Sequence, residues 1–519
     1  MAKTTGLEVQ DPRADGAVVG PDGEAVALAE GQQWFGHPRG LSTLFFTEMW
    51  ERFSYYGMRA ILILFMTAAV AGQNPGLGIT VGTAAAIYGL YTFFVYVLSL
   101  PGGWVADNIW GQKRAVFVGG VIIMLGHISL AVPTNVTFFL GLALVVVGTG
   151  LLKPNVSTMV GDLYPEGGAR RDAGFSIFYM GINIGAFAGT ALVSWIGESF
   201  NFHWGFSLAA IGMFFGLVQY KLGWKHLGTA GDLKTEDSAE RVAQKSQRFY
   251  LVAGAFVAVV ILVGFLLYNG LLPITIEQLA GSLGVVVVVL AIGYFLYLHF
   301  AGGLTTLEKK RLWVIFWLFI LAALFWMGFE QAGSSLNLFA RDLTDRTFGG
   351  WEMPAGWLQN VNPFFIIVLA PVFGAMWVWL QKRHLNPSIP LKFAFGLFGL
   401  AVGFFVLSWG AANATPENPV SPAWLVVTYF FHTAGELALS PVGLSSMTKL
   451  APKGRVGQMM GVWFIAAALG NLFAGLTAGQ LETLAPDALF WNVALIVGGA
   501  GLVALLASPF VKKLMGDVE

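Results

Sequence analysis

The chain has 519 residues, of which 56% are hydrophobic and 11% are charged, and its 29 basic residues balance its 29 acidic ones. A soluble protein carries about 25% charged residues, so this composition excludes an ordinary soluble enzyme, and zero net charge without a basic tract argues against nucleic acid as a partner. The absence of Cys excludes disulfides, thiolate metal sites and Cys nucleophiles.

Apolar segments account for most of the chain. Residues 1–36 are polar and have no apolar core followed by a cleavage site, so we expect a flexible cytoplasmic tail over residues 1–40. From Leu41 to Phe510, runs of about 18 to 25 apolar residues recur, and about 20 such residues cross a bilayer. They predict an all-α polytopic membrane protein with fourteen transmembrane helices. These lie near residues 41–71, 81–106, 115–132, 136–161, 172–198, 204–223, 249–269, 279–301, 312–333, 357–381, 391–411, 423–448, 457–482 and 488–510.

The basic residues lie on one side of the predicted helices. Alternate connecting segments hold 24 of the 29 Lys and Arg residues, whereas the opposite segments hold only Arg341 and Arg346. Cytoplasmic loops of membrane proteins are enriched in Lys and Arg. We therefore predict a multi-pass protein of the inner (cell) membrane with both termini in the cytoplasm.

Seven ionisable residues lie well inside apolar segments. They are Glu48, Glu51, Arg52, Arg59, Lys153, Glu330 and Glu436. Facing lipid, each would cost about 3 kcal/mol, and the sum would exceed the net stability of a typical domain. These side chains must therefore face a wet cavity or one another, with at least one carboxylate left free to take up a proton.

The first predicted helix carries a polar stripe. At 100° per residue, five polar or amphipathic side chains fall on one face within about 100° of arc. They are Glu48, Glu51, Arg52, Tyr55 and Arg59. One interpretation is a buried salt-bridge network that only joins helices. Because both signs of charge run over three turns, we favour a pathway for a substrate and an ion.

Two further features indicate a transporter built from two halves. The segment GGWVADNIWGQKR (Gly102–Arg114) matches the GxxxDxxxGxKR loop of major facilitator transporters, and NIGAFAG (Asn183–Gly189) resembles LGNLFAG (Leu469–Gly475). The loop residues that match are Gly103, Asp107, Gly111, Lys113 and Arg114. Parallel repeats of six helices, with the site between them, characterise such transporters. We expect an amino-terminal bundle over 41–225, a cytoplasmic polar loop over 226–248, two extra helices within 249–301 and a carboxy-terminal bundle over 302–519.

Four motifs resemble those of the proton-dependent oligopeptide transporter (POT/PTR) family of the major facilitator superfamily, including its bacterial di- and tripeptide transporters. They are EMWERFSYYGMR (Glu48–Arg59), FYMGINIGAFAG (Phe178–Gly189), FWMGFEQAGSSLNLFA (Phe325–Ala340) and GELALSPVGLS (Gly435–Ser445). The resemblance covers essentially the whole chain. It implies a major facilitator fold and symport of di- and tripeptides with protons by alternating access, with the proton as coupling ion and no other cofactor.

The resemblance also implies roles for single residues. Arg59 and Lys153 would bind the peptide carboxylate, and Glu436 the peptide α-amine. The peptide backbone would be bonded by Asn183 and Asn362, and side-chain pockets lined by Tyr55, Tyr56, Tyr96 and Trp463. A proton-linked network would comprise Glu48, Glu51 and Arg52 with Lys153. Glu330 would pair with Arg59 and release it on protonation. Mammalian members carry His at the position of Gly89, so coupling here would not use that residue.

Other functions remain open at this point. The same proton machinery would also serve a carrier of another small anion or a peptidomimetic, although an acid in the pocket, Glu436, favours a substrate with an amine. A sensor that transports nothing is a further alternative. An enzyme is disfavoured, since the chain has no HExxH motif and no Ser nucleophile motif. We expect a monomer whose partners are the peptide, protons and the lipid bilayer.

Overall fold

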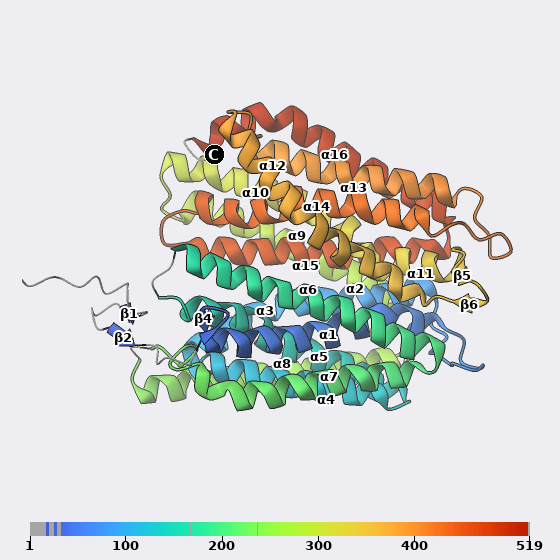
Figure 1. The fold of residues 1–519 in the computed structure, drawn as a ribbon, viewed down its shortest axis with the longest axis horizontal. Helices are drawn as coiled ribbons and strands as arrows, with labels where there is room; N and C mark the ends of the chain where they lie inside the picture. Colours follow the sequence, from blue (N-terminus) through green and yellow to red (C-terminus); the bar gives the residue numbers. More distant parts are fainter. Residues whose placement is uncertain (1–16, 20–24, 28–32, 166–167, 236, 517–519) are drawn as a thin grey trace, which may run out of the picture.

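The computed structural model describes residues 17–19, 25–27, 33–165, 168–235 and 237–516, and most of the expected flexible tail lies outside them. Long helices run side by side along one axis (Figure 1). They are α1 (Arg39–Thr67), α2 (Val81–Val97), α4 (Gln112–Ala131), α5 (Asn135–Asp162), α6 (Gly168–Ser199), α7 (Phe202–Gly223), α8 (Ala239–Tyr268), α9 (Ile276–Ala301), α10 (Thr306–Phe329), α12 (Val361–Lys382), α13 (Ile389–Ala411), α14 (Ala423–Leu450), α15 (Val456–Ala478) and α16 (Pro486–Met515). The shorter elements are α3 (Ser99–Val105), the π-helix η1 (Ala106–Trp110), α11 (Ser335–Asp342), the 3₁₀ helices η2 (Trp224–His226), η3 (Glu330–Gly333), η4 (Ala355–Asn360) and η5 (Gly479–Glu482), and the strands β1 (Ala17–Val19), β2 (Ala25–Ala27), β3 (Gln33–Trp34), β4 (His37–Pro38), β5 (Thr347–Phe348) and β6 (Trp351–Glu352).

The structure confirms the all-α polytopic fold. Within the described residues, twelve helices are long and apolar enough to cross a membrane. α1 and α14, with 29 and 28 residues, are also long enough, and they carry five of the seven intramembrane charges. These two bring the membrane-crossing helices of the described chain to fourteen, as the sequence predicts.

Several helix limits differ from the expectation, and two of these differences are the most informative. α8 begins at Ala239, inside the stretch expected to be a polar loop, because the Ser238 side chain accepts a hydrogen bond from the backbone N–H of Arg241 and caps the helix there. The helix expected over 312–333 changes at Glu330 from α to 3₁₀ geometry and continues as α11. The first change lengthens an extra helix, and the second lies at an intramembrane charge.

Helix pairs recur between the two ends of the chain. α1 packs on α6 as α10 packs on α15, α4 packs on α5 as α13 packs on α14, and α4 packs on α7 as α13 packs on α16. In Figure 1 the early helices occupy the lower part of the bundle and the late ones the upper part. This is the arrangement of two six-helix halves. The residue limits of the halves stay a prediction.

Glycines bring α6 against α1. A Cβ on Gly185 would collide with the backbone oxygen of Met49, and a Cβ on Gly189 with that of Phe53. These glycines are four residues apart and so share one helix face. Contact of small residues lets membrane helices pack closely where the hydrophobic effect contributes nothing. The NIGAFAG motif thereby fixes the rotation of α1, and with it the direction of its polar stripe.

A second glycine contact joins the halves. A Cβ on Gly475 of α15 would lie 2.5 Å from the backbone oxygen of Ala85 on α2, and one on Gly89 would lie 3.0 Å from that of Leu472. Gly89 therefore belongs to the seam between α2 and α15. The extra helix α9 packs on this seam, against both α2 and α15.

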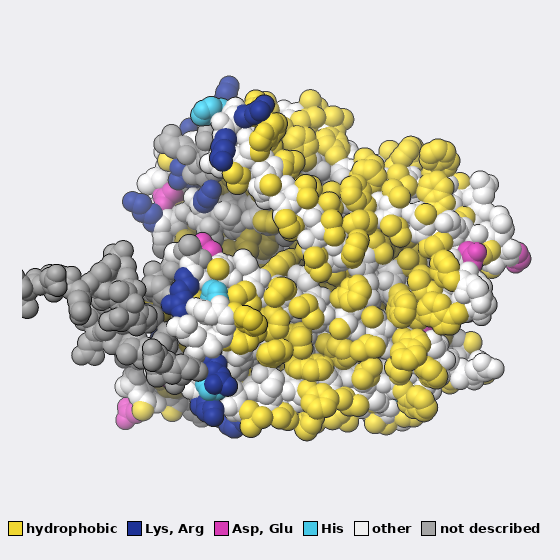
Figure 2. Space-filling view, in the orientation of Figure 1, with side chains coloured by type: hydrophobic (Ala, Val, Ile, Leu, Met, Phe, Trp, Pro, Cys, Tyr) yellow, Lys and Arg dark blue, Asp and Glu magenta, His cyan; other side chains and the backbone are white. Residues whose placement is uncertain are grey.

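The two ends of the bundle differ in charge. Lys and Arg gather at one end, here called the basic end, and the other end shows acidic groups (Figure 2). α1 begins and α16 ends at the basic end, whereas α11, β5 and β6 lie at the opposite end (Figure 1). The two halves thus share one orientation along the membrane normal.

Candidate functional site

A cavity of about 200 Å³ lies between the halves. Its lining comes from α1, α2 and α6 on one side and from α10, η3, η4, α12 and α14 on the other. The residues of the lining that the sequence predicts are Tyr56, Arg59, Tyr96, Asn183, Glu330, Asn362 and Glu436. The cavity thus brings one strong base, Arg59, from one half and two acids, Glu330 and Glu436, from the other into one space, where a polar substrate would bind.

An ion pair crosses the cavity between the halves. Arg59 Nη2 of α1 lies 2.5 Å from Glu330 Oε2, and both side chains are buried. Arg59 also donates through Nε to the hydroxyl of Tyr88. Gly333 makes room for this group, since a Cβ there would collide with the Tyr88 hydroxyl and lie 3.0 Å from Arg59 Nε. The 3₁₀ turn that begins at Glu330 thereby places the Glu330 carboxylate and Gly333 against Arg59.

Glu436 has a different environment. Its Oε2 accepts a hydrogen bond of 3.1 Å from Asn362 Nδ2, which also donates to Thr433 Oγ1 at 2.9 Å. No base lies within ion-pair distance of Glu436 in the described part of the chain. A carboxylate held by neutral donors retains acceptor capacity for a cation, such as an ammonium group.

The remaining charges of α1 lie behind the cavity. Arg52 Nε is 2.7 Å from Glu48 Oε1 and 2.9 Å from Glu51 Oε2, and all three side chains are nearly inaccessible. Lys153 Nζ sits 4.1 Å from the ring centroid of Tyr96, a cavity residue. Two acids and one Arg leave one negative charge, which Lys153 offsets electrostatically. The predicted proton-linked network is therefore one layer removed from the cavity.

Three residues predicted to bind the substrate lie outside the lining: Lys153, described above, Tyr55 and Trp463. Tyr55 stacks on Tyr91 with ring centroids 6.4 Å apart, beneath the Arg52 guanidinium. Trp463 packs against Phe393, with ring centroids 6.5 Å apart. Both aromatic side chains are buried. Contact of these three residues with a substrate stays a prediction.

The lining also includes residues to which the sequence assigns no role. They are Tyr179, Ile182, Ala186, Thr190, Trp326, Phe329, Ala332, Gln359, Pro363, Ile366, Tyr429 and His432. Helical spacing offers a signal for some of them. Tyr179 and His432 each lie four residues before a predicted site residue, Asn183 and Glu436, and so share its helix face.

The GxxxDxxxGxKR loop forms part of the basic end. Gly111 has a φ of 75°, which a residue with a side chain rarely adopts. Lys113 is buried and pairs with Asp232 at 2.8 Å, while the guanidinium of Arg114 lies over the Trp110 ring. Asp107 accepts a hydrogen bond of 3.2 Å from Gln112. The Lys113–Asp232 pair thus ties α4 to the segment after α7. Gly103 lies beside Pro154 of α5.

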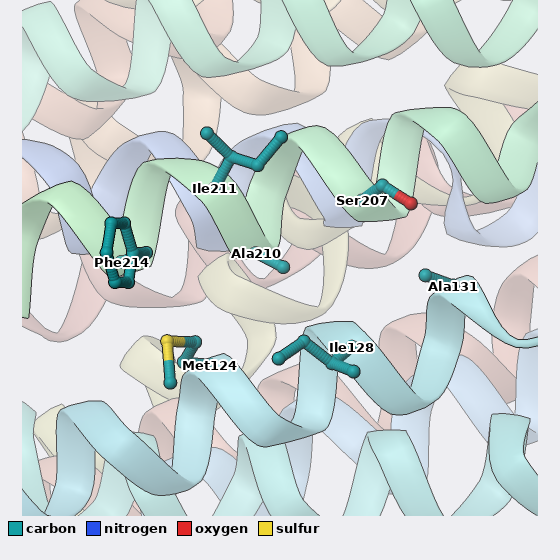
Figure 3. A pocket seen from close by; sticks show the side chains of 7 residues that line it. All are labelled: Met124, Ile128, Ala131, Ser207, Ala210, Ile211 and Phe214. Carbon is teal, nitrogen blue, oxygen red and sulfur yellow. The ribbon is translucent and has the colours of Figure 1, made fainter.

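A larger space of about 410 Å³ lies on the outside of the bundle, between α4 and α7 (Figure 3). Its lining is apolar except for Ser207, whose hydroxyl donates to the backbone oxygen of His203 at 2.8 Å. It offers no charge to a polar substrate and is not a candidate for the functional site.

Two halves of membrane-crossing helices around a charged cavity define a membrane transporter. The model of the POT family matches residues 113–491. Two curated relatives span nearly the whole chain: peptide transporter YePEPT of Yersinia enterocolitica is 41% identical over 502 residues, 94% of this chain and 97% of the relative. The di-/tripeptide transporter of Lactococcus lactis subsp. lactis is 38% identical over 496 residues, 94% and 98%. The chain therefore belongs to the POT family.

Solved structures of similar chains agree with this assignment. A peptide transporter POT in complex with sulfate is 41% identical, with a TM-score of 0.85 and coverage of 98% of this chain and 99% of that one. A POT family transporter in complex with 5-aminolevulinic acid is 36% identical, with a TM-score of 0.84 and coverage of 93% and 98%. The match extends over both halves.

Proposed function

We propose that this protein imports di- and tripeptides together with protons by alternating access. The observation that carries the proposal is the placement of a base, Arg59, in one half and an acid, Glu436, in the other half of one cavity. A zwitterionic peptide has a carboxylate and an ammonium separated by one to three residue lengths, each about 3.3–3.6 Å. Binding both ends would draw the halves together while leaving the side chains free to vary.

The proton enters this scheme through Glu330. In the structure Glu330 forms an ion pair with Arg59, so a peptide carboxylate and Glu330 compete for the same base. Protonation of Glu330 removes its charge and frees Arg59 for the peptide, which couples proton and peptide occupancy. One proton that moves down 100 mV supplies about 2.3 kcal/mol, enough for roughly fifty-fold accumulation.

The proposal includes an orientation. Because Lys and Arg gather at the basic end, the positive-inside tendency supports a cytoplasmic basic end and cytoplasmic termini in the inner membrane.

Hydrogen bonds between the halves lie at the end of the bundle opposite the basic end. Asn337 Nδ2 donates to the backbone oxygen of Ala60 at 2.7 Å, and Arg341 Nη1 donates to Thr67 Oγ1 at 2.7 Å. The described state is accordingly closed on the outside. We further infer a monomer without a resident cofactor.

Uptake into proteoliposomes tests the proposed function. With an inward proton gradient, labelled dialanine is expected to accumulate inside, and a protonophore is expected to collapse the accumulation. Empty liposomes are the control. Uptake that reaches only equilibrium, with or without the protonophore, would contradict proton coupling.

A second candidate is a carrier of another small anion or a peptidomimetic on the same machinery. The relative crystallised with 5-aminolevulinic acid favours it, since that compound also carries an amine and a carboxylate. Competition decides between the two: excess unlabelled 5-aminolevulinic acid that blocks uptake more strongly than dialanine would favour the second candidate.

A further inference from the structure

A carboxylate closes the opposite end of the bundle across the two halves. Glu198, in the last turn of α6, accepts hydrogen bonds from the backbone N–H groups of Ala355 at 2.7 Å and Gly356 at 2.9 Å. Those residues begin η4, which leads directly into α12 of the other half. One side chain of the amino-terminal half thus holds two backbone groups of the carboxy-terminal half.

The negative charge of Glu198 is unfavourable at the end of its own helix, α6, and favourable at the start of η4. A negative charge in the last turn of a helix opposes the helix dipole, whereas one at the first turn is stabilised by it. η4 has no side-chain cap of its own, because Pro354 precedes it, so its first N–H groups would lack partners. Glu198 supplies the cap from across the interface.

Further contacts hold η4 close to α6 beside Glu198. Trp357 Nε1 donates to the backbone oxygen of Ala191 on α6 at 2.8 Å, next to the cap. A Cβ on Gly356 would collide with Ser194 Oγ and lie 3.1 Å from Glu198 Oε1. Close approach of η4 to α6 therefore requires Gly at this position.

The charged groups that act on Glu198 are Arg346 and Arg341. Each is within 2.7 Å of another acid, Arg346 of Glu352 and Arg341 of Asp342. Neither forms an ion pair with Glu198 within the described residues, so the two backbone N–H groups are its direct hydrogen-bond donors there. A proton on Glu198 would remove its charge and turn one oxygen into a hydroxyl, which is a weaker acceptor than a carboxylate oxygen, so the hydrogen bonds from the two N–H groups would weaken.

We propose that Glu198 is a proton-operated latch of the outer gate. As a carboxylate Glu198 caps η4 and holds the outside closed. Once protonated it binds the two N–H groups less strongly, so an acidic medium outside favours opening. At high proton concentration outside, protonation of Glu198 would favour the outward-open state of the substrate-free carrier. This inference rests on the orientation given under the proposed function.

A distance measurement tests the latch without transport. The chain has no Cys, so Phe200→Cys and Phe348→Cys, both exposed and at the opposite end, place two spin labels on either side of the gate. In lipid nanodiscs, acidification is expected to increase the long-distance population. Glu198→Gln is expected to raise the open-to-closed ratio about tenfold at alkaline pH, equivalent to about 1.4 kcal/mol. In a Glu330→Gln background, which removes the other proton site between the halves, it is expected to remove the pH dependence.

Two further variants separate the latch from a structural cap. Gly356→Ala crowds the closed contact without changing charge, so it is expected to raise the open population. Molecules that stay closed keep the Glu198 contact, and the pH dependence is therefore expected to remain. Glu417→Gln, on an exposed loop, is expected to behave as the parent.

Wild-type distances and wild-type pH dependence in Glu198→Gln would overturn the proposal, as would a folded Gly356→Ala with an unchanged open population. If Glu198→Gln fails to fold, Gly356→Ala decides alone. A failed peptide-uptake assay would overturn the proposed substrate and leave the distance result standing.

Discussion

Glu330→Gln is expected to abolish accumulation of dialanine against a gradient while exchange of dialanine across the membrane continues. The amide resembles the protonated acid in shape and charge, so Arg59 loses its ionic partner permanently and stays available to the peptide carboxylate. Without a group that binds and releases a proton, the gradient no longer drives uptake. Accumulation is expected to fall from roughly fifty-fold to equilibrium, as the free energy of one proton at 100 mV implies.

Counterflow and gradient-driven uptake, measured on the same vesicles, check this result. Glu417→Gln serves as the matched control, since that carboxylate lies on an exposed loop away from the cavity. Full proton-driven accumulation by Glu330→Gln would exclude the pair with Arg59 as the coupling element. Loss of both activities would point to a general defect in the carrier.

Glu436→Ala is expected to weaken the binding of dialanine far more than the binding of N-acetyl-dialanine. Truncating one partner of a buried charged pair typically costs 2–5 kcal/mol, so we expect the affinity for dialanine to fall about a hundredfold. A peptide with a blocked amine never forms this pair. Its already weak binding should change little.

Competition against labelled dialanine measures both affinities. Asn362→Ala is the informative comparison, because it removes the hydrogen-bond donor to Glu436 and retains the charge. It should affect the two peptides to a similar, smaller extent. Equal losses for the free and blocked peptides in Glu436→Ala would argue against an ammonium site.

The cavity could be located from the sequence because charges in a membrane are costly. Arg59, Glu330 and Glu436 interrupt apolar segments that otherwise need no polar residue, and all three lie on one cavity. The cost of a membrane charge is the same in the cavity lining and in the packed interior, so it does not distinguish the two places. Glu51 shares the α1 stripe with Arg59, yet it lies behind the lining because α6 glycines set the rotation of α1.

Other features depend on contacts that no local pattern contains. The change of geometry at Glu330 places its carboxylate against Arg59, 271 positions away in the chain. Glu198 resembles an ordinary interfacial acid at the end of an apolar segment, and its two acceptor bonds appear only when η4 of the other half is in place. The family resemblance indicated the pair at Arg59 but gave no indication of the contact at η4.

The central claim, that one carrier moves a proton with each peptide, is tested most directly by the pH inside the vesicle. Proteoliposomes that contain a pH-sensitive dye start with equal pH on both sides and a negative interior, and dialanine is added outside. The account predicts acidification of the lumen that requires dialanine and is absent from Glu330→Gln. Peptide entry with no change in lumenal pH would contradict it.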